Sequence, residues 1–494
     1  MKKIYFGVAA LAGLASVALA SCGEDAKPTT QNPGETTTDV QPGTTTEVPE
    51  PQEGKHEDNT VDLTAALNTS DFSGTAEDKT IVFYHTMGDS LQETLKVAID
   101  AFNAKYPDWT IEHSQIGGYN DVRSRCIAGL AAGNQPDLAY CYADHVAQYL
   151  KTGKVVDMSD YVNATGTLNG EAIGYSATEI ADFVQGYYKE GFATNYGAYS
   201  DYGYKDGDIL TFPFVKSTEV LYYNKDALKE AGITKVPSTW DKLIGVGDAL
   251  IKKGYKSPMM GYSKDSSNCF MNTVAYPIFL STLSKNSEAL ALANNLDPQA
   301  GPYMREALES VKYLVDSKIV DLDECDKISN NYNDVIMRFF EGDVPMMICN
   351  ADTASGTKKR EIKSEAFTKT PFKYSFAPIP MTDGGYFIDS PSVEFSVNKN
   401  CDNLEMTNEF MRFLISNKEL NMISSTKGLV TPTKKISFDS LYVPFSKIPA
   451  KRIISPEVLG VKDPLAGQIK NASFRVGRAE LTIEEAIAKY GSIA

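Results

Sequence analysis

The sequence predicts an α/β protein in which two doubly wound lobes are joined by hinge strands. Three observations support this fold class. About 415 of the 494 residues follow the N-terminal region, which is enough chain for two lobes with separate cores. Residues 80–116 have the pattern of a strand, a helix and a second strand. Residues 209–224 form an extended run split by polar residues, which favours a segment that crosses between lobes.

The N-terminus has the pattern of an export signal. Lys2 and Lys3 precede an apolar run at 4–20 that is too short and wrongly flanked for a membrane span. The tetrad Leu19-Ala20-Ser21-Cys22 resembles the bacterial lipobox, in which the cysteine is lipidated and becomes the new N-terminus. We therefore expect a signal peptide at 1–21 and lipidation of Cys22. The alternative is an ordinary signal followed by a chance cysteine.

Residues 22–78 are rich in Thr, Pro and Glu and poor in apolar side chains, so we expect a disordered tether. From 23 to 80 there are thirteen Asp or Glu and three Lys, which account for most of the chain's net charge of −16. The acidity therefore belongs mainly to a solvated tether, and no nucleic-acid partner is expected. Such a tether would hold the folded body off a membrane and leave it mobile.

The first lobe is predicted to begin with a parallel βαβ unit. Residues 80–85 have the pattern of a buried strand. A helix is expected from Ser90, with Glu93 completing a capping box, until Tyr106-Pro107 stops it. A second strand at 109–116 makes the unit parallel and right-handed.

A second helix and a third strand continue the doubly wound pattern. The helix is predicted from Tyr119 to Ala132, with Gly133 ending it, and the strand at 137–142. Residues 151–208 are rich in Gly and Tyr and poorly periodic, so we expect loops and short helices there.

The crossing segment is predicted to be two short strands on either side of Ser217-Thr218. Pro213 argues against a central position in a sheet, because proline has no N–H to donate. After Asn224 the pattern becomes helical and ends at Gly232. Ser217 and Thr218 would then present hydroxyls to the gap between the lobes.

The rest of the chain predicts a more helical second lobe and a return to the first. A capped helix is expected to start at 237–243, and Thr482 and Glu485 to box a last helix that Gly491 ends. Helices are expected near 270–284, 302–318, 333–340 and 403–427, and strands near 344–349, 374–379 and 386–397.

Six cysteines follow Cys22, and none lies in a C-x-x-C pair. We expect most of them to be small buried core residues. An exported protein could also pair some of them, and spacing alone does not give the connectivity.

Seven motifs in this order resemble the extracellular solute-binding proteins of the maltose-binding, family 1 type, which feed ABC importers. The resemblance covers nearly all of 80–430. The motifs are Phe83–Gly88, Phe102–Pro107, Gly118–Asp121, Ala132–Asp137, Ser217–Asp226, Pro237–Trp240 and Phe340–Met346.

The resemblance implies the two-lobed periplasmic-binding-protein fold, also called a Venus flytrap. It places 79–220 with about 380–430 in the N-terminal lobe, and 221–379 with about 431–494 in the C-terminal lobe. It further implies a monomer outside the cytoplasm, held to the cell membrane by its lipid, that hands a carbohydrate to ABC permease subunits. No catalysis, cofactor or metal is implied.

In open α/β sheets, ligands sit beyond the carboxyl ends of strands. A sugar needs carboxylates and amides for its hydroxyl pairs and an aromatic face for its apolar side. Residues of these types, with hydroxyls near the crossing, follow the predicted strands. The predicted ligand-binding residues are Tyr84, His85, Asp89, Tyr119, Tyr142, Asp144, Ser217, Thr218, Asn350, Asp352, Ser355 and Ser390.

Within the family, the chain is most similar to the glycerol-3-phosphate-binding branch, whose tyrosine and hinge serine match Tyr119 and Ser217. It departs where that branch has a further ligand tyrosine, since Leu429 stands there. A phosphate also favours an arginine, and Arg475 or Arg478 could serve only if the tail folds into the cleft. We therefore expect a sugar or oligosaccharide, with glycerol phosphate as the alternative.

The sequence also bears on three other classes of protein: an enzyme, a metal-binding importer component, and a structural surface lipoprotein or adhesin. No nucleophile, zinc-protease or nucleotide-binding motif is present, although paired carboxylates for glycoside hydrolysis leave no sequence signature. His85, His145 and Asp144 could converge on zinc as in a metal-binding importer component, but a third nitrogen ligand is missing. A structural surface lipoprotein or adhesin would be expected to show repeats, and none is seen.

Overall fold

The computed structural model describes residues 78–493 with internal gaps. The signal peptide, Cys22 and the tether lie outside the described residues. The gaps are 143–144, 147, 169, 193–201, 217–218, 267–268, 328–331, 350–353, 382–385, 388–392, 398–403, 428–431, 436–439, 446–452, 455, 457–458, 460 and 462.

The first sheet has five strands in the order β2-β1-β3-β12-β6. The three strands predicted at its start are parallel, with β1 between β2 and β3. β12 runs antiparallel to both of its neighbours. The strands are β1 (Thr80–His85), β2 (Thr110–Gln115), β3 (Leu138–Cys141), β6 (Phe212–Val215) and β12 (Val393–Val397).

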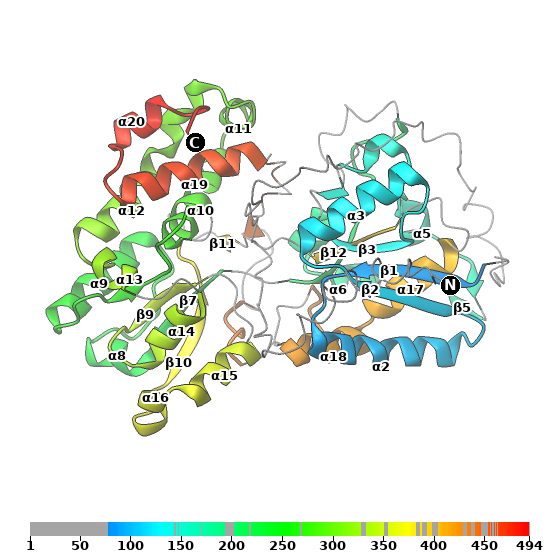
Figure 1. Cartoon of the computed structure of the whole chain (residues 1–494), viewed down its shortest axis with the longest axis horizontal. Coiled ribbons are helices and arrows are strands. Elements are labelled where there is room, and N and C mark those ends of the chain that lie inside the picture. The colour runs from blue at the N-terminus through cyan, green and yellow to red at the C-terminus, as the bar shows by residue number, and fades with distance from the viewer. Residues whose placement is uncertain are drawn as a thin grey trace, which may run out of the picture. The chain divides into compact units, whose positions relative to one another are not determined.

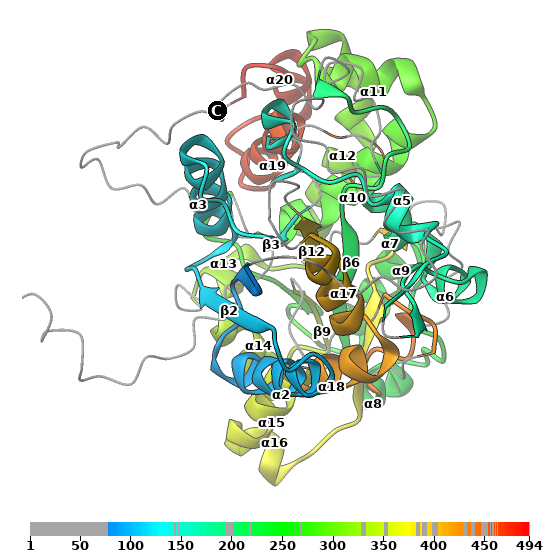
Figure 2. The ribbon, with the colours of Figure 1, turned by 90° about the vertical axis from the view of Figure 1, so that its right-hand side faces the viewer.

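Helices cover both faces of the first sheet, as the doubly wound pattern requires. Side chains alternate between faces along a strand, so Ile81 and Phe83 share one face of β1. That face packs against α2 (Asp89–Lys105) and α17 (Leu404–Leu414). α18 (Asn417–Lys427) lies beside α2 (Figures 1 and 2). α3 (Tyr119–Ala132) covers the other face.

Short elements fill the region between β3 and β6, as the weak periodicity predicted. They are η2 (Leu150–Thr152), α5 (Ser159–Val162), β4 (Thr167–Leu168), β5 (Glu171–Ala172), α6 (Ala177–Asp182) and α7 (Gln185–Glu190).

The chain passes from the first sheet to the second between β6 and β7 (Val220–Asn224). β6 is an edge strand, which confirms the position inferred from Pro213. Asn224 caps the helix α8 (Lys225–Glu230), because its side chain accepts hydrogen bonds from the N–H groups of Asp226 and Ala227. Ser217 and Thr218 lie outside the described residues.

The second sheet has four strands in the order β10-β7-β9-β8 and is mainly antiparallel. Only β8 and β9 run parallel. Its other strands are β8 (Met259–Met260), β9 (Met346–Cys349) and β10 (Tyr374–Pro378), and two more short strands pair elsewhere, β11 (Tyr386–Phe387) and β13 (Ile453–Ile454).

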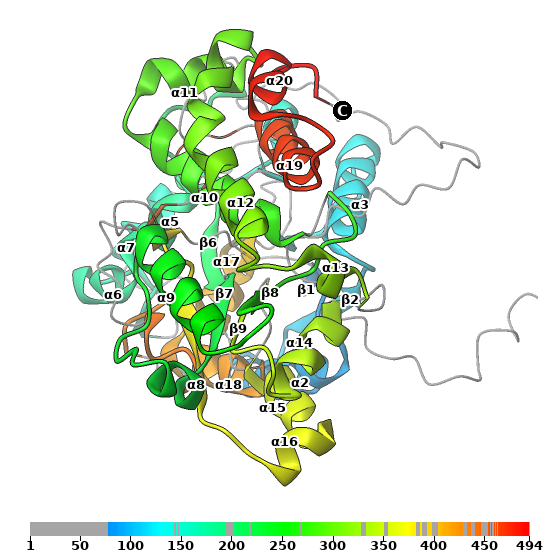
Figure 3. The same ribbon diagram turned by 90° about the vertical axis from the view of Figure 1, so that its left-hand side faces the viewer.

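Most of the remaining helices surround this second sheet. α10, α12 and α19 lie side by side (Figures 1 and 3). The helices are α9 (Trp240–Lys252), α10 (Phe270–Ser284), α11 (Ser287–Asn294), η4 (Pro298–Met304), α12 (Arg305–Asp316), α13 (Leu322–Asp326), α14 (Tyr332–Phe340), α15 (Ala354–Lys363), α16 (Glu365–Lys369), α19 (Asp463–Gly477) and α20 (Ile483–Ala488).

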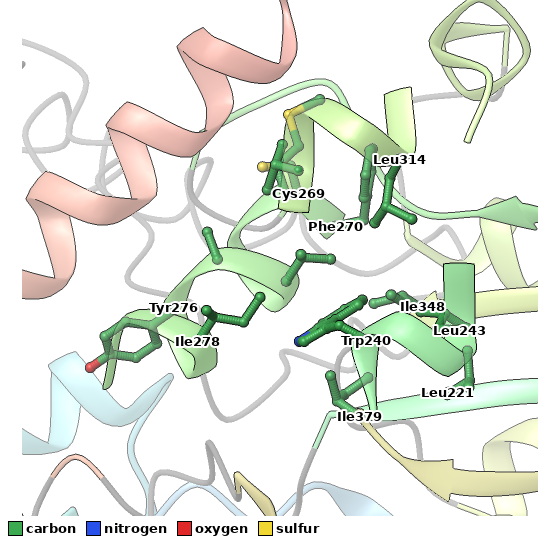
Figure 4. Close-up of a cluster of buried hydrophobic side chains, with 14 of the residues drawn as sticks. Leu221, Trp240, Leu243, Cys269, Phe270, Tyr276, Ile278, Leu314, Ile348 and Ile379 are labelled. Atoms are coloured by element: carbon green, nitrogen blue, oxygen red, sulfur yellow. The ribbon is translucent and has the colours of Figure 1, made fainter. Parts of the chain in front are cut away.

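α10 is the centre of the second core. Nearly all its residues are buried, because α12 and α19 cover it on the side away from the sheet. Figure 4 shows Ile278 of α10 near Trp240 of α9, with Leu221 of β7 and Ile348 of β9 close by. The two sheets therefore have separate cores, as expected for two lobes.

Three local predictions were wrong. The helix expected to be capped within 237–243 does begin there, at Trp240, but its N-cap residue Thr239 makes no side-chain cap hydrogen bond. α2 starts at Asp89 with Gly88 as its N-cap and no side-chain cap, so the predicted box at Ser90 and Glu93 does not form. The single strand predicted at 386–397 is divided into β11 and β12, which belong to different sheets. By contrast, the capping box of Thr482 and Glu485 on α20 is confirmed.

Candidate functional site

Two of the three predicted tyrosines, Tyr119 and Tyr142, meet where β1 and β3 end. Because these neighbouring strands are parallel, their carboxyl ends lie at the same edge of the sheet. Tyr119 is the first residue of α3, and Tyr142 follows β3 directly. Their rings stack with centroids 4.4 Å apart and an interplanar angle of 28°. The structure thus brings two predicted site residues together.

A third tyrosine joins this pair. The ring of Tyr140 in β3 lies 5.7 Å from that of Tyr119, and the ring of His145 lies 4.8 Å from that of Tyr142. We call Tyr119, Tyr140, Tyr142 and His145 the tyrosine cluster. Tyr140 was not predicted, although it lies in β3 only two residues before Tyr142, and residues two apart in extended chain share a face.

The hydroxyl groups of Tyr119 and Tyr140 stay protonated at neutral pH. Burial raises the pKa of Tyr119, whose hydroxyl hydrogen-bonds with Thr86 and Tyr140. Burial also raises the pKa of Tyr140 well above its ordinary value. Neutral phenols both donate and accept hydrogen bonds. Tyr140 and His145 are buried, so the partly exposed members of the cluster are Tyr119 and Tyr142.

His85 is the predicted site residue that the structure contradicts. Its side chain is fully buried, and its Nε2 lies 3.0 Å from Nδ1 of His113. Its Nδ1 accepts a hydrogen bond from the backbone N–H of Met87 at 3.1 Å. Both ring nitrogens are therefore engaged within the lobe. Burial, and then the neighbouring His113, lower the pKa of His85 to about 3, so the ring is neutral.

Tyr84 and Asp89 lie near the same edge but outside the tyrosine cluster. Tyr84 is half-buried and packs against the core beneath α3, on the face of β1 opposite to Phe83. Asp89 is exposed in the first turn of α2, where a carboxylate is also favoured by the helix dipole. A structural role is thus sufficient to explain Asp89.

The other predicted ligand-binding residues lie in parts of the chain that the structure does not describe. Ser355 is in α15, but its side chain is outside the described part. The rest, with Leu429, are wholly outside it: Asp144, Ser217, Thr218, Asn350, Asp352 and Ser390.

Arg478 is engaged elsewhere. Its guanidinium donates to both carboxylate oxygens of Asp326, at 3.0 and 2.8 Å, and to the carbonyl oxygen of Ser263. Arg475 lies 3.7 Å from the carboxylate of Glu480. The tail thus supplies Arg478 to a bidentate ion pair with Asp326, so one of the two arginine candidates for binding a phosphate is already paired.

No three metal-ligating side chains converge among the described residues, so the zinc alternative gains no support there. Cys126, Cys141, Cys269 and Cys325 are buried and not in disulfides, as predicted for core residues. Burial raises the pKa of the Cys126, Cys269 and Cys325 thiols to about 12, which keeps them unreactive. None of the described helices is both long and apolar enough to cross a membrane.

The described part of the chain thus has two sheets with separate cores, and aromatic side chains gather where β1 and β3 end. A model of the bacterial extracellular solute-binding proteins matches residues 97–442, which is more than half of the chain. The chain belongs to this family.

Relatives with known roles match over a shorter stretch. The sn-glycerol-3-phosphate-binding periplasmic protein UgpB of Shigella flexneri is 31% identical over 189 residues, which are 37% of this chain and 39% of that protein. UgpB of Escherichia coli K12 is 30% identical over the same length. The match therefore spans well under half of these relatives. They are named as binding proteins.

Solved structures match along most of the chain at low identity. The sugar-binding protein MalE of Xanthomonas citri has a TM-score of 0.64 at 16% identity, covering 83% of this chain and 95% of that one. The ligand-free form of RafE from Streptococcus pneumoniae has a TM-score of 0.60 at 16% identity, covering 85% and 98%. A protein described as a probable secreted solute-binding lipoprotein from Streptomyces coelicolor reaches 0.62 at 16%, covering 85% and 99%. These matches confirm the two-lobed fold.

Proposed function

We propose that the protein is the lipid-anchored substrate-binding component of an ABC importer. It captures a sugar or oligosaccharide in a cleft between its lobes, closes on it, and delivers it to the permease without chemistry of its own. The observation that carries this proposal is family membership over 97–442. It is supported by fold neighbours described as binding raffinose and maltose.

The tyrosine cluster favours a carbohydrate. A pyranose has an apolar face that packs on aromatic rings and hydroxyls that pair with neutral polar groups. Tyr119 and Tyr142 are partly exposed aromatic residues at the edge where ligands of open α/β sheets bind, so their rings could supply the apolar contact. We propose these two with Tyr84 and Asp89, and with the predicted residues outside the described part, as the ligand-binding set. His85 is left out because it is buried.

sn-Glycerol 3-phosphate is the second candidate ligand. The 31% identity with UgpB over 189 residues favours it. The ion pair of Arg478 with Asp326 weighs against it, because that guanidinium is already matched to a carboxylate.

The domain boundaries remain those proposed from the sequence. The N-terminal lobe would comprise 79–220 and about 380–430, and the C-terminal lobe 221–379 and about 431–494. Membership of β12 in the first sheet and of α19 in the second core supports the two returns of the chain.

Anchoring through Cys22 of a monomeric receptor is the remaining part of the proposal. The lipobox-like tetrad supports it, as does the lipoprotein description of the Streptomyces coelicolor neighbour. Cells fed an alkyne-bearing fatty acid should label the protein, and Cys22→Ser should abolish the label and release the protein from membranes. Labelling that survives this substitution contradicts the anchor.

A thermal-shift screen of the purified folded body tests the ligand class. Raffinose, maltose, sn-glycerol 3-phosphate and zinc chloride are compared. A ligand at a hundred times its dissociation constant adds about 2.7 kcal/mol to the free energy of unfolding. A shift with a sugar supports the proposal, a shift with glycerol phosphate alone favours the second candidate, and a shift with zinc alone contradicts both. Release of reducing sugar from an oligosaccharide would instead indicate a hydrolase.

Substitution of one stacked tyrosine tests the site. Tyr119→Ala should weaken binding of the shifting ligand by about tenfold to a hundredfold, since an aromatic contact is lost. Calorimetric titration measures the change. Tyr313→Ala is the matched control, because Tyr313 is an exposed tyrosine on α12 of the other lobe. Equal affinities of the two variants would remove Tyr119 from the site.

A further inference from the structure

A completely buried ion pair lies next to the crossing between the sheets. Lys216 follows β6, and its ammonium contacts the carboxylate of Glu190 at the end of α7. Both side chains have no solvent exposure. The ammonium also lies 5.3 Å from the centre of the Tyr187 ring. Lys216 and Glu190 are 26 residues apart, so no local sequence pattern announces the pair.

α7 joins the two cores at this point. Tyr187 belongs to the core of the second sheet, whereas the next residue, Tyr188, belongs to the core of the first sheet. The ring of Tyr188 lies 5.7 Å from that of Phe212 in β6. The ion pair therefore attaches α7 to the strand that leads out of the first sheet towards β7.

The chain passes between the two cores a second time near Pro432, and the segment that leads into α7 is hydrogen-bonded to it there. The N–H of Val184 donates to the carbonyl of Pro432 at 2.8 Å, and the N–H of Lys434 donates to the carbonyl of Asp182 at 2.8 Å. Before Pro432 the chain packs in the first core through Ile423, and after it the chain reaches the second core at Tyr442. Residues 182–190 thus connect two separate crossings.

Stability alone does not explain this arrangement. Removing two charges from water is costly, and a well-packed apolar pair of the same volume is often as stable. A buried ion pair instead favours one geometry over others, because either charge displaced from its partner is left buried. Here the geometry concerned is that of two crossings between the cores.

We propose that Lys216 and Glu190 are positioning residues: their ion pair clamps the two crossings to α7 and thereby sets how the lobes meet around a bound solute. The effect on solute affinity rests on the function proposed above. The effect on the crossings themselves does not, because it follows from contacts within the chain.

The test compares hydrogen–deuterium exchange in the wild-type protein with exchange in four variants. Lys216→Met and Glu190→Gln each remove one partner, Lys216→Met with Glu190→Gln removes both charges, and Lys216→Arg keeps the charge. Arg305→Met with Glu484→Gln is the control, because that ion pair is exposed and joins α12 to α20 within the second lobe. Peptides from 182–191, 212–224 and 432–442 report on the crossings, and peptides from β1 and β9 report on the lobe interiors.

Each single neutralising variant is expected to lower the midpoint of thermal unfolding by roughly 5 °C. The double variant should recover most of this loss of thermal stability. Its peptides at the crossings should still exchange at least tenfold faster than those of the wild type, while the exchange rates of β1 and β9 stay unchanged. Lys216→Arg and the control should resemble the wild type. The probe that raises the unfolding temperature of the wild type, whether raffinose, maltose or sn-glycerol 3-phosphate, should bind the double variant at least tenfold more weakly than it binds the wild type.

The proposal is overturned if the peptides at the crossings exchange at the same rate in the double variant as in the wild type. It is also overturned if the exchange rates of β1 and β9 rise as much as those of the crossings. If no probe shifts the wild type, the proposed function fails, while the exchange comparison still decides the role of the pair. If the double variant exchanges faster only at the crossings but binds a probe with the affinity of the wild type, the ion pair does not position the solute site, and that part of the proposal is overturned.

Discussion

The core of the first sheet holds a buried carboxylate, whereas the core of the second sheet is organised by a helix that is buried on all sides. In the first, Glu409 of α17 accepts hydrogen bonds from the hydroxyls of Tyr106 at 2.8 Å and Tyr161 at 3.3 Å, and Lys105 lies 3.4 Å away. In the second, α10 packs between the sheet and α12 and α19.

The difference shows that the two lobes depend on different interactions. A buried network holds its members in one arrangement only while every partner is present. A helix that is apolar all round is stabilised by the volume that its side chains fill. The first lobe should therefore be sensitive to polar substitutions and to pH, and the second to cavities.

The largest effect is expected from a cavity in the second core. Phe279 of α10 is fully buried and its ring lies 6.3 Å from that of Tyr490. Phe279→Ala should lower the free energy of unfolding by about 4 kcal/mol, because contacts are lost and the cavity closes only in part. Denaturant titration measures it, with Tyr313→Ala as an exposed aromatic control expected to change it by less than about 1 kcal/mol.

Hydrogen exchange sharpens this prediction. Peptides of β9 should exchange faster in Phe279→Ala than in the wild type, while those of β1 should change little. Equal acceleration in both strands would mean that the two cores unfold as one unit, and the comparison between the lobes would then not hold.

The next effect is expected from the first core. Glu409→Ala should cost about 3 kcal/mol, since the hydroxyls of Tyr106 and Tyr161 lose a buried charged acceptor. Here the acceleration of exchange should appear in β1 and be absent from β9. Glu93→Ala, at an exposed glutamate on α2, is the control. A cost no larger than that of this control would show that the network contributes little.

The smallest effect is a dependence on pH that belongs to the first lobe. Burial lowers the pKa of both His85 and His113, that of His85 to about 3. The unfolded chain takes up protons that the folded chain excludes, so this stability is complete above about pH 6.5 and falls as the pH falls towards 3. For His85 the loss between pH 8 and pH 5 is about 2 kcal/mol.

His85→Gln should reduce this loss, measured as the difference between denaturation at pH 8 and at pH 5. Val97→Ala is the control, because Val97 is exposed on α2 of the same lobe and carries no titratable group. An unchanged acid dependence in His85→Gln would assign the loss to other groups.

Much of the fold was predictable because its signals are local. α3 runs from Tyr119 to Ala132 as predicted, and Gly133 ends it in a left-handed conformation with φ of 76°. The edge position of β6 followed from Pro213. Strand partners were not predictable, because β12 pairs with strands made far earlier in the chain. The start of α2 was misplaced because Gly88 caps it without any side chain.

The candidate site was predicted in part for the same reason. Tyr119 and Tyr142 were found because residue type and strand-end position both pointed to them, and their rings do stack. His85 failed because the last residue of a strand points to one face or the other, and here it points into the core. Lys216 and Glu190 were missed because charged residues are normally exposed.

The position of β12 has a consequence for how the protein is made. This strand lies between β3 and β6, yet it is encoded some 250 residues after β3 and about 180 after β6. During synthesis, the first sheet therefore stays incomplete between β3 and β6 until the last quarter of the polypeptide has emerged from the ribosome. Completion of the first-made half of the protein therefore depends on residues that are among the last to be synthesised.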